Sequence, residues 1–347
     1  MRKHLLPLAA LLSATALTAQ EKAAVPSPPE IVNAAPKADW VAIAASDLMV
    51  IDLAPPDRGP GQASAKGKPR RVVIQLMPAP FSEGWVSNIR KLAAARFWDG
   101  LSINRVQDNY VVQWGDANGE DQVKARKLPE GLAVVPESAY ELPVSRPAFC
   151  RSGDLAVCRQ PGAINHDTIN FRNGSMHDPY RGNDGFWRGW PVAAEMPTVS
   201  IIPGDRNEPS TVWPVHCYGM VGVGRDMPPN TGTGAELYTV IGHAPRHLDR
   251  NIALVGRVIE GIEHLSSLPR GTGALGFYET AEERTPIVSV RIGTEVSGLP
   301  AYEYLSTETE SFARYADARA NRRDAFFIRP AGGADVCNIP VPVRRVK

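Results

Sequence analysis

Charge of either sign is not in excess in this sequence. The 347 residues carry 38 Lys and Arg against 37 Asp and Glu, a formal net charge of +1. Because nucleic acids and anionic membranes attract proteins through an excess of positive charge, a near-neutral chain argues against either as a partner. With 43% hydrophobic and 22% charged residues, the composition is that of a globular protein long enough to bury a sizeable core.

A long hydrophobic run is also missing. The apolar stretch near the N-terminus extends only from Leu5 to Leu17, behind Arg2 and Lys3. These are the parts of a secretory signal peptide, whereas a membrane span needs about 20 apolar residues. No cysteine follows the run, which argues against a lipid anchor. We predict a signal peptide over residues 1–20 and an exported, periplasmic protein without a stable membrane span after cleavage; secretion from the cell and an uncleaved anchor are the alternatives.

Cysteine is scarce, and the chain has four: Cys150, Cys158, Cys217 and Cys337. In an exported chain an even number indicates disulfides, and four cysteines allow three pairings. The short segment between the first two contains Gly and favours a bond within that pair, which leaves the last two to bond with each other. Four buried thiols are the alternative. The spacings do not resemble those of a zinc site.

One segment, residues 165–190, raises a metal hypothesis. It contains four candidate ligands: His166, Asp167, His177 and Asp178. No two of the histidines fall at the spacing of helical or tight-turn ligands, so turn-capping by the aspartates is the better explanation. We predict no metal and no other cofactor.

After the predicted signal peptide, residues 21–70 are rich in Pro, Ala, Gly and Lys. This composition predicts an extension or linker, with one ordered piece over residues 40–53. Regular structure is expected from Arg71, where RVVIQLMPAP has the pattern of a buried strand. Ser82 is expected to cap a helix. The apolar positions of that helix recur at helical spacing: Trp85, Ile89 and Leu92.

The strongest functional signal is the stretch FWDGLSINRVQDNYVVQWGDANG, residues 97–119. Two short runs with strand-like alternation, 101–106 and 110–114, flank turn-forming residues, which predicts a β-hairpin. Arg105 ends the first strand, and Gln113 lies on the second beside aromatic and β-branched neighbours. An Arg fork next to an apolar surface can hold a carbonyl oxygen or a polarised amide without proton chemistry.

Residues 120–216 contain many prolines and little periodicity. Because proline breaks helices and cannot donate to a strand ladder, long helices and central strands are not expected here. The segment is too long to be a passive connection and too apolar to be simply disordered. We predict an ordered, loop-rich insertion.

Alternating apolar residues return after the insertion. They predict strands over four stretches: 217–226, 237–242, 252–261 and 286–296. With the earlier elements this makes about seven short strands and two short helices without strand-helix alternation, which indicates an antiparallel barrel or sandwich with helices at its ends. Residues 71–296 are the predicted domain. Residues 297–347 are a C-terminal extension, in which 308–323 has helical composition with Phe312 and Tyr315 as its apolar face.

The order of these elements resembles that of the cyclophilin-type peptidyl-prolyl cis-trans isomerases. The blocks that carry the resemblance are, in chain order, RVVIQLMPAP, WVSNIRKL, FWDG, INRV, NYVVQWGD, GMVGVGRD, NTGTGAELYTVIG and ALVGRVIEGIEHL. They cover residues 71–295, interrupted by the insertion. The resemblance implies a mainly β fold, a closed antiparallel eight-stranded barrel capped by two helices, with the active site on the outer face of the sheet. It also implies Pro-containing polypeptides as substrates. The oligomeric state is not predicted.

The family's functional positions carry over unevenly. In the hairpin they match the catalytic Arg105 and Gln113 and, in the proline pocket, Tyr110 and Val111. In the later blocks the peptide-binding and pocket positions fall on Gly224, Arg225, Glu236, Tyr238, His247, Leu248 and Ile252. The departures from the family are Arg225 in place of an asparagine, Glu236 of a glutamine, Tyr238 of a phenylalanine, His247 of a tryptophan and, most seriously, Ile252 of the pocket histidine.

These departures leave two functions open. Ile252 keeps bulk but loses a polar contact, and a carboxylate at Glu236 can pair with Arg105 or Arg225. The first hypothesis is an exported prolyl isomerase that works without covalent chemistry. The second is a catalytically weak or inactive cyclophilin-like scaffold that binds Pro-containing segments or a partner protein. A metallohydrolase built on the insertion is a weaker third.

Overall fold

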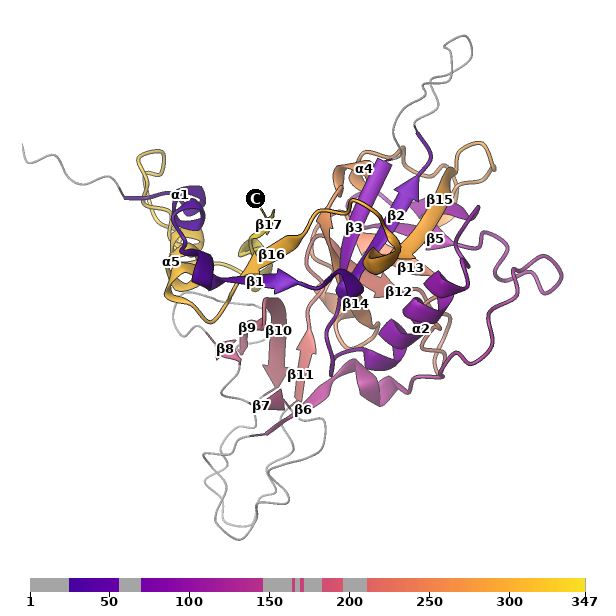
Figure 1. Ribbon diagram of the computed structural model, residues 1–347, viewed down its shortest axis with the longest axis horizontal. Coiled ribbons are helices and arrows are strands. Elements are labelled where there is room, and N and C mark those ends of the chain that lie inside the picture. The colour runs from indigo at the N-terminus through magenta and orange to yellow at the C-terminus, as the bar shows by residue number, and fades with distance from the viewer. Residues whose placement is uncertain are drawn as a thin grey trace, which may run out of the picture.

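Three β-sheets organise the part of the chain that the computed structural model describes (Figure 1). The residues that the structure describes are 25–55, 70–145, 164–165, 169–171, 183–195 and 211–346. One sheet closes into a barrel, at the right of Figure 1, and the two smaller sheets lie beside it. The helices α1, Pro28–Asn33, and α5, Glu310–Ala320, lie at the left of the picture, away from the barrel.

The barrel has the strand order β12-β13-β5-β4-β15-β2-β3-β14, and all its neighbours pair antiparallel. Its strands are β2 Leu48–Leu53, β3 Arg70–Leu76, β4 Ser102–Val106, β5 Val111–Gly115, β12 Met220–Val223, β13 Leu237–Val240, β14 Leu254–Glu260 and β15 Thr285–Ile292. The predicted closed antiparallel barrel of eight strands is therefore confirmed.

Two helices cap the barrel, α2 Glu83–Ala94 and α4 Glu263–Ser266. The apolar face of α2 is fully buried, as its spacing predicts: Trp85, Ile89 and Leu92. Ser82 is the N-cap residue of α2, as predicted, but its side chain does not cap the helix. Its hydroxyl donates to the carbonyl oxygen of Leu254 at 2.6 Å and makes no bond to the helix, because its backbone is left-handed, with φ of 52°. The residue ties the start of the helix to the barrel instead.

The barrel begins earlier than residue 71. Strand β2 lies inside the predicted extension 21–70 and pairs with both β3 and β15. The residues of β2 are buried apart from Asp52, which accepts two hydrogen bonds from Arg71 at 2.8 Å each. The ordered piece predicted over residues 40–53 contains this strand. Its place in the barrel was not predicted, because the Pro- and Gly-rich stretch between β2 and β3 has the composition of a linker.

The insertion contains a sheet of its own, with the order β7-β6-β11-β10-β9-β8. Its strands are β6 Leu142–Ser145, β7 Ile164–Asn165, β8 Asn170–Phe171, β9 Asp184–Trp187, β10 Trp190–Glu195 and β11 Thr211–Pro214. The expectation that prolines exclude central strands is wrong for β10, which pairs with β9 and β11. Its Pro191 is the second residue of the strand and Pro214 is the last of β11, so the missing N–H groups fall near strand ends.

One strand from the N-terminal part of the chain and two from the C-terminal part form the third sheet, with the order β1-β16-β17. Its strands are β1 Trp40–Ile43, β16 Tyr302–Leu305 and β17 Val343–Arg345. Two helices pack together beside it, α1 Pro28–Asn33 and α5 Glu310–Ala320. The predicted helix in the C-terminal extension is confirmed, and its apolar face, Phe312 and Tyr315, is buried.

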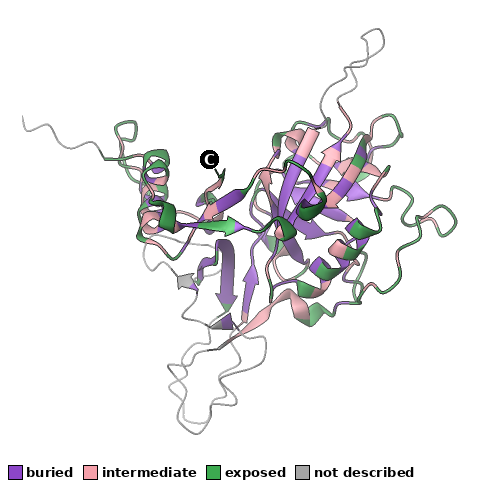
Figure 2. Cartoon of the chain, viewed as in Figure 1, coloured by how far each residue is buried: buried purple, intermediate pink, exposed green. Residues whose placement is uncertain are grey.

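The barrel and the insertion share one hydrophobic core (Figure 2). Phe81 meets Trp187 of the insertion edge to face, with ring centres 5.2 Å apart. Arg257, buried on β14, donates from Nη1 to the carbonyl oxygen of Gly189 at 2.6 Å and lies 4.6 Å above the ring of Trp190. Burial lowers the pKa of Arg257 to about 10. The described part of the insertion is therefore integral to the barrel and does not form a separate module.

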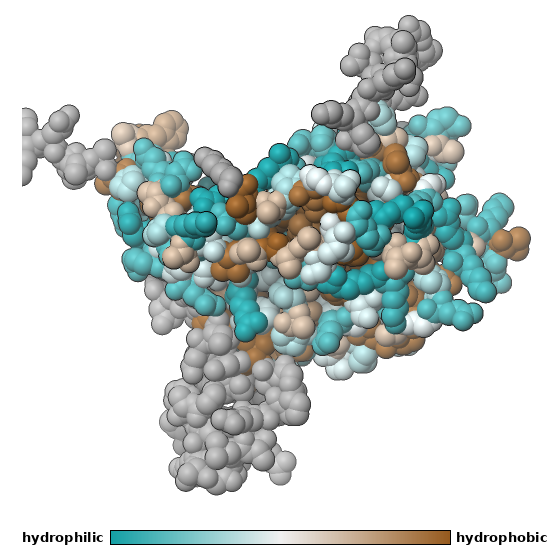
Figure 3. Space-filling model, in the orientation of Figure 1, coloured by the Kyte–Doolittle hydropathy of each residue, from teal (hydrophilic) through white to brown (hydrophobic). Residues whose placement is uncertain are grey.

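The molecular surface carries mostly hydrophilic side chains over α2 and the neighbouring barrel strands on the face that Figure 3 shows. None of the helices in the described part of the chain combines the length and the apolar character that a membrane span requires. The predicted signal peptide, residues 1–20, lies outside the described residues.

One predicted disulfide, Cys217–Cys337, is present and joins residues 120 apart in sequence. The other predicted pair, Cys150 and Cys158, lies outside the described residues. So do the four candidate ligands of the metal hypothesis: His166, Asp167, His177 and Asp178. The described residues contain no group of three or more His, Cys, Asp or Glu that could hold a metal ion.

Candidate active site

An apolar cluster, separate from the main core, lies on the outer face of the barrel. Its members are Tyr110, Val111, Tyr238, Val240, Leu248 and Ile252. Strands β5 and β13 supply the centre, where Val111 pairs with Val240 and Gln113 with Tyr238. The loop after the short helix η6, Arg246–Leu248, supplies the rim. We call this set the pocket cluster. It brings together five of the predicted pocket residues and adds Val240, which the alternation of LYTVIG could have indicated.

Arg105 lies half-buried at the edge of the pocket cluster. It faces Gln113 across the β4–β5 hairpin, and its Nη1 donates to Oε1 of Gln113 at 3.3 Å. Its guanidinium carbon is 5.8 Å from the ring centre of Tyr110. The hairpin therefore gathers the predicted donor, the predicted amide and one pocket aromatic at one place.

A loop that the sequence did not connect with the site closes over Arg105. Its Nε donates to the carbonyl oxygen of Leu275 at 2.8 Å, and its guanidinium lies 5.2 Å from the ring centre of Phe277. Nη2 donates to Oε1 of Gln107. Burial lowers the pKa of Arg105, but the ordinary value of an arginine is so high that the group stays charged. The contacts with Leu275 span 170 residues, which local patterns cannot reveal.

Glu236 points into the barrel wall beneath Gln113. Its Oε1 accepts the backbone N–H of Asp116 at 2.6 Å, and its carboxylate also accepts from the side-chain amides of Asn104 and Gln113. Burial outweighs these bonds and raises the pKa of Glu236 to about 7. Glu236 forms no ion pair with Arg105 among the described residues. It instead holds the amide nitrogen of Gln113, so that the amide oxygen faces the guanidinium.

Two glycines leave room for the side chains around the site. A Cβ atom on Gly115 would lie 2.0 Å from Oε1 of Glu236, and one on Gly222 would lie 2.3 Å from the hydroxyl of Tyr238. Real Cβ atoms do not approach so closely. Gly115 in NYVVQWGD and Gly222 in GMVGVGRD thus each make room for one neighbouring site residue.

The remaining predicted positions lie at the rim. Gly224 donates its N–H to the carbonyl oxygen of Glu236 at 2.8 Å. The Nε of Arg225 donates at 2.9 Å to the carbonyl oxygen of Asn251, next to Ile252. His247 is exposed and stacks on Tyr110, with ring centres 6.3 Å apart and 10° between the planes. It therefore continues the aromatic wall that begins at Tyr110.

One buried residue behind the pocket cluster was missed by the sequence reasoning. Nε2 of His216 lies 2.8 Å from the hydroxyl of Tyr238, and Nδ1 lies 2.9 Å from Asp249. Burial raises the pKa of Tyr238 well above its ordinary value, so the phenol keeps its hydrogen. The sequence carries no signal for this contact beyond the presence of a histidine beside Cys217.

The fold is that of the cyclophilins. The chain is similar to cyclophilin AquaCyp293 from Hirschia baltica, with a TM-score of 0.59, 19% identity and coverage of 89% of this chain and 94% of that one. A second solved structure is a cyclophilin type peptidyl-prolyl cis-trans isomerase of Cryptosporidium parvum in the presence of the dipeptide Ala-Pro, with a TM-score of 0.35, 10% identity and coverage of 71% and 98%. No curated protein sequence matches.

The family model described as "Cyclophilin type peptidyl-prolyl cis-trans isomerase/CLD" matches residues 69–294. The chain therefore belongs to this family, and its enzyme class is peptidyl-prolyl cis-trans isomerase. This confirms the resemblance drawn from the sequence blocks.

Proposed function

We propose that the chain isomerises X-Pro bonds of exported polypeptides, with Arg105 as the hydrogen-bond donor and the pocket cluster as the site for the proline ring. The observation that carries the proposal is the position of Arg105, charged and half-buried, between Gln113 and the ring of Tyr110. The apolar cluster can bury the proline ring of a peptide, while the cation at its rim can donate to the polar peptide backbone.

The reaction needs no nucleophile. Rotation about an X-Pro bond crosses a barrier of about 18–20 kcal/mol because amide resonance is lost in the twisted state. In that state the imide nitrogen regains its lone pair. A donor that meets this developing lone pair or the twisted carbonyl lowers the barrier, provided that it binds the twisted state better than the planar one.

Arg105 has donors left for a substrate. A guanidinium carries five N–H groups, and the described residues engage three of them, through Leu275, Gln113 and Gln107. The two that remain can reach a peptide on the pocket cluster. The three protein contacts hold the guanidinium plane fixed, so little reorganisation is required when the bond twists.

Support for exported substrates is independent of the site. The sequence of residues 1–20 has the form of a signal peptide. The Cys217–Cys337 disulfide is of a kind that persists in oxidising compartments such as the periplasm. Proline-containing polypeptides that fold or turn over outside the cytoplasm are therefore the proposed substrates.

The test is the cis/trans exchange rate of an X-Pro peptide, measured by NMR exchange spectroscopy with the mature protein. We expect acceleration by the native protein and loss of most of it in Arg105→Ala. Arg314→Ala, which removes an exposed arginine of α5, is the matched control and should leave the rate unchanged. Peptide binding without acceleration in the native protein would contradict the proposal and would support the binding scaffold.

A further inference from the structure

His216 is a buried residue with a partner for each ring nitrogen. It follows β11, where the insertion returns to the barrel, and its side chain is only 1% exposed. Nε2 lies 2.8 Å from the hydroxyl of Tyr238, and Nδ1 lies 2.9 Å from Oδ1 of Asp249. The His216 and Tyr238 rings are nearly parallel, at 10°. The buried imidazole therefore contacts the pocket cluster at Tyr238, on the side away from solvent.

The direction of these hydrogen bonds follows from the chemistry of the partners. The carboxylate of Asp249 can only accept, so Nδ1 carries a hydrogen, and in this tautomer of a neutral imidazole Nε2 accepts from the hydroxyl of Tyr238. Asp249 also accepts the backbone N–H of His216 at 2.9 Å and Nε of Arg246 at 2.7 Å. Both oxygens of Asp249 are thus occupied, and the imidazole is held in one orientation.

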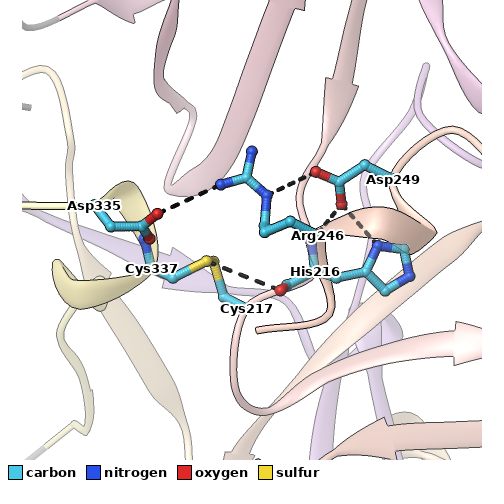
Figure 4. Close-up of a disulfide and its surroundings, with 6 residues drawn as sticks. All are labelled: His216, Cys217, Arg246, Asp249, Asp335 and Cys337. Atoms are coloured by element: carbon cyan, nitrogen blue, oxygen red, sulfur yellow. Dashed lines mark hydrogen bonds and ion pairs between the residues drawn. A yellow bond between two sulfur atoms is a disulfide. The ribbon is translucent and has the colours of Figure 1, made fainter. Parts of the chain in front are cut away.

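The C-terminal segment completes this arrangement (Figure 4). Cys217, next to His216, is bonded to Cys337, whose sulfur lies 3.9 Å from the carbonyl oxygen of His216. Asp335, two residues before Cys337, faces Arg246 at 3.7 Å. Figure 4 shows the side chain of Arg246 between the two carboxylates. The insertion, the η6 loop and the C-terminal segment therefore meet behind the pocket.

We propose that His216 is a positioning residue: it sets the ring of Tyr238 in the proline pocket, and the disulfide-linked C-terminal segment holds His216 in place. The proposal rests on the proposed function. The hydroxyl of Tyr238 has a fixed partner and a matching space above Gly222, so the ring cannot shift along its axis without losing the bond. The insertion and the C-terminal extension thereby support the pocket.

The kinetic signature follows from what the pocket binds. The proline ring occupies the pocket cluster in both the planar and the twisted state of the X-Pro bond. A loosened pocket cluster therefore weakens the binding of both states equally, which raises KM with little change in kcat. Arg105 acts on the twisted state and changes kcat. Loss of one neutral hydrogen bond corresponds to roughly a five- to tenfold change in affinity.

The experiment is a double-mutant cycle with His216→Leu and Tyr238→Phe, read out as kcat and KM from NMR exchange. We expect His216→Leu to raise KM roughly five- to tenfold with kcat within about twofold, and to have no further effect in the Tyr238→Phe background. His216→Gln can still offer the hydroxyl a partner and should restore part of the affinity. Unchanged KM in folded His216→Leu, or an equal effect in both backgrounds, would overturn the proposal.

Three further measurements complete the test. If His216→Leu does not fold, Tyr238→Phe alone tests the same bond, and an unchanged KM overturns the proposal. If the native protein does not accelerate exchange, the proposed function fails, and the same cycle is read as the Kd of an Ala-Pro-containing peptide. Replacement of Cys217 and Cys337 by Ala should raise KM in the same direction; no change would overturn the role of the C-terminal segment.

Discussion

The amide oxygen of Gln113 lies 3.3 Å from Nη1 of Arg105, while Glu236 accepts from the amide of the same Gln113. A glutamine amide has one donor end and one acceptor end, so a carboxylate on the donor side fixes the acceptor toward the guanidinium. Glu236 therefore acts on Arg105 through Gln113.

Replacement of Gln113 tests this arrangement. We expect Gln113→Leu to lower kcat about tenfold, because the guanidinium loses the bond that orients it and the twisted state is bound less well. The measurement is NMR exchange at saturating peptide. Gln122→Leu, at an exposed glutamine, is the matched control. An unchanged kcat in Gln113→Leu would show that the contacts with Leu275 and Gln107 suffice to orient Arg105.

Glu236 gives the stability a pH dependence. Burial raises its pKa from 4.5 to about 7, so the folded state holds a proton that the unfolded state releases. This contribution is complete below about pH 4.5 and is lost as the pH rises to about 7, a change of about 3 kcal/mol by linkage.

The check is urea denaturation of the native protein and Glu236→Gln at several pH values. The difference in unfolding free energy between the two should grow from pH 4.5 to 7 in favour of the variant. Glu130→Gln, at an exposed carboxylate, should track the native protein. A constant difference would mean that the carboxyl of Glu236 is already ionised at pH 4.5.

Gly222 tolerates no side chain. We expect Gly222→Ala to destabilise the fold by about 1–3 kcal/mol, because its Cβ would lie 2.3 Å from the hydroxyl of Tyr238. Thermal unfolding measures the loss. Addition of Tyr238→Phe removes the closest oxygen and should recover part of it. No recovery would indicate that the ring carbon, also 2.3 Å away, dominates the clash.

Arg257 joins the barrel to the insertion. Arg257→Met would leave the carbonyl oxygen of Gly189 and Oε1 of Gln75 buried without this donor, at a cost of about 2 kcal/mol or more. Urea unfolding should show the loss in one transition, since both parts share the core. Arg314→Met should stay within about 0.5 kcal/mol of the native protein. Separate transitions would contradict a common core.

The elements predicted well from the sequence are those that neighbouring residues specify. The β4–β5 hairpin lies within a residue or two of its expected bounds, because alternation and turn residues specify it, and α2 follows its apolar spacing. Strand β2 lies in the ordered piece predicted over residues 40–53, but its place in the barrel was not predicted, because a Pro- and Gly-rich stretch separates it from β3. The contacts of Arg105 with Leu275 and of Tyr238 with His216 depend on segments far apart in the chain, and no periodicity records them.

The hydroxyl of Tyr238 is tied to two neighbouring residues, Gly222 and His216. A phenylalanine at this position would have no hydroxyl for a buried imidazole to hold, but its ring would still lie against Gly222, because a Cβ there would be 2.3 Å from the ring carbon Cζ. The hydroxyl and His216 are therefore useful only together, and both depend on the glycine, because removal of any one of the three leaves a clash, a void or an unsatisfied polar group. We therefore expect the three residues to be inherited as a set among relatives of this chain, and to have arisen alongside the insertion that delivers His216.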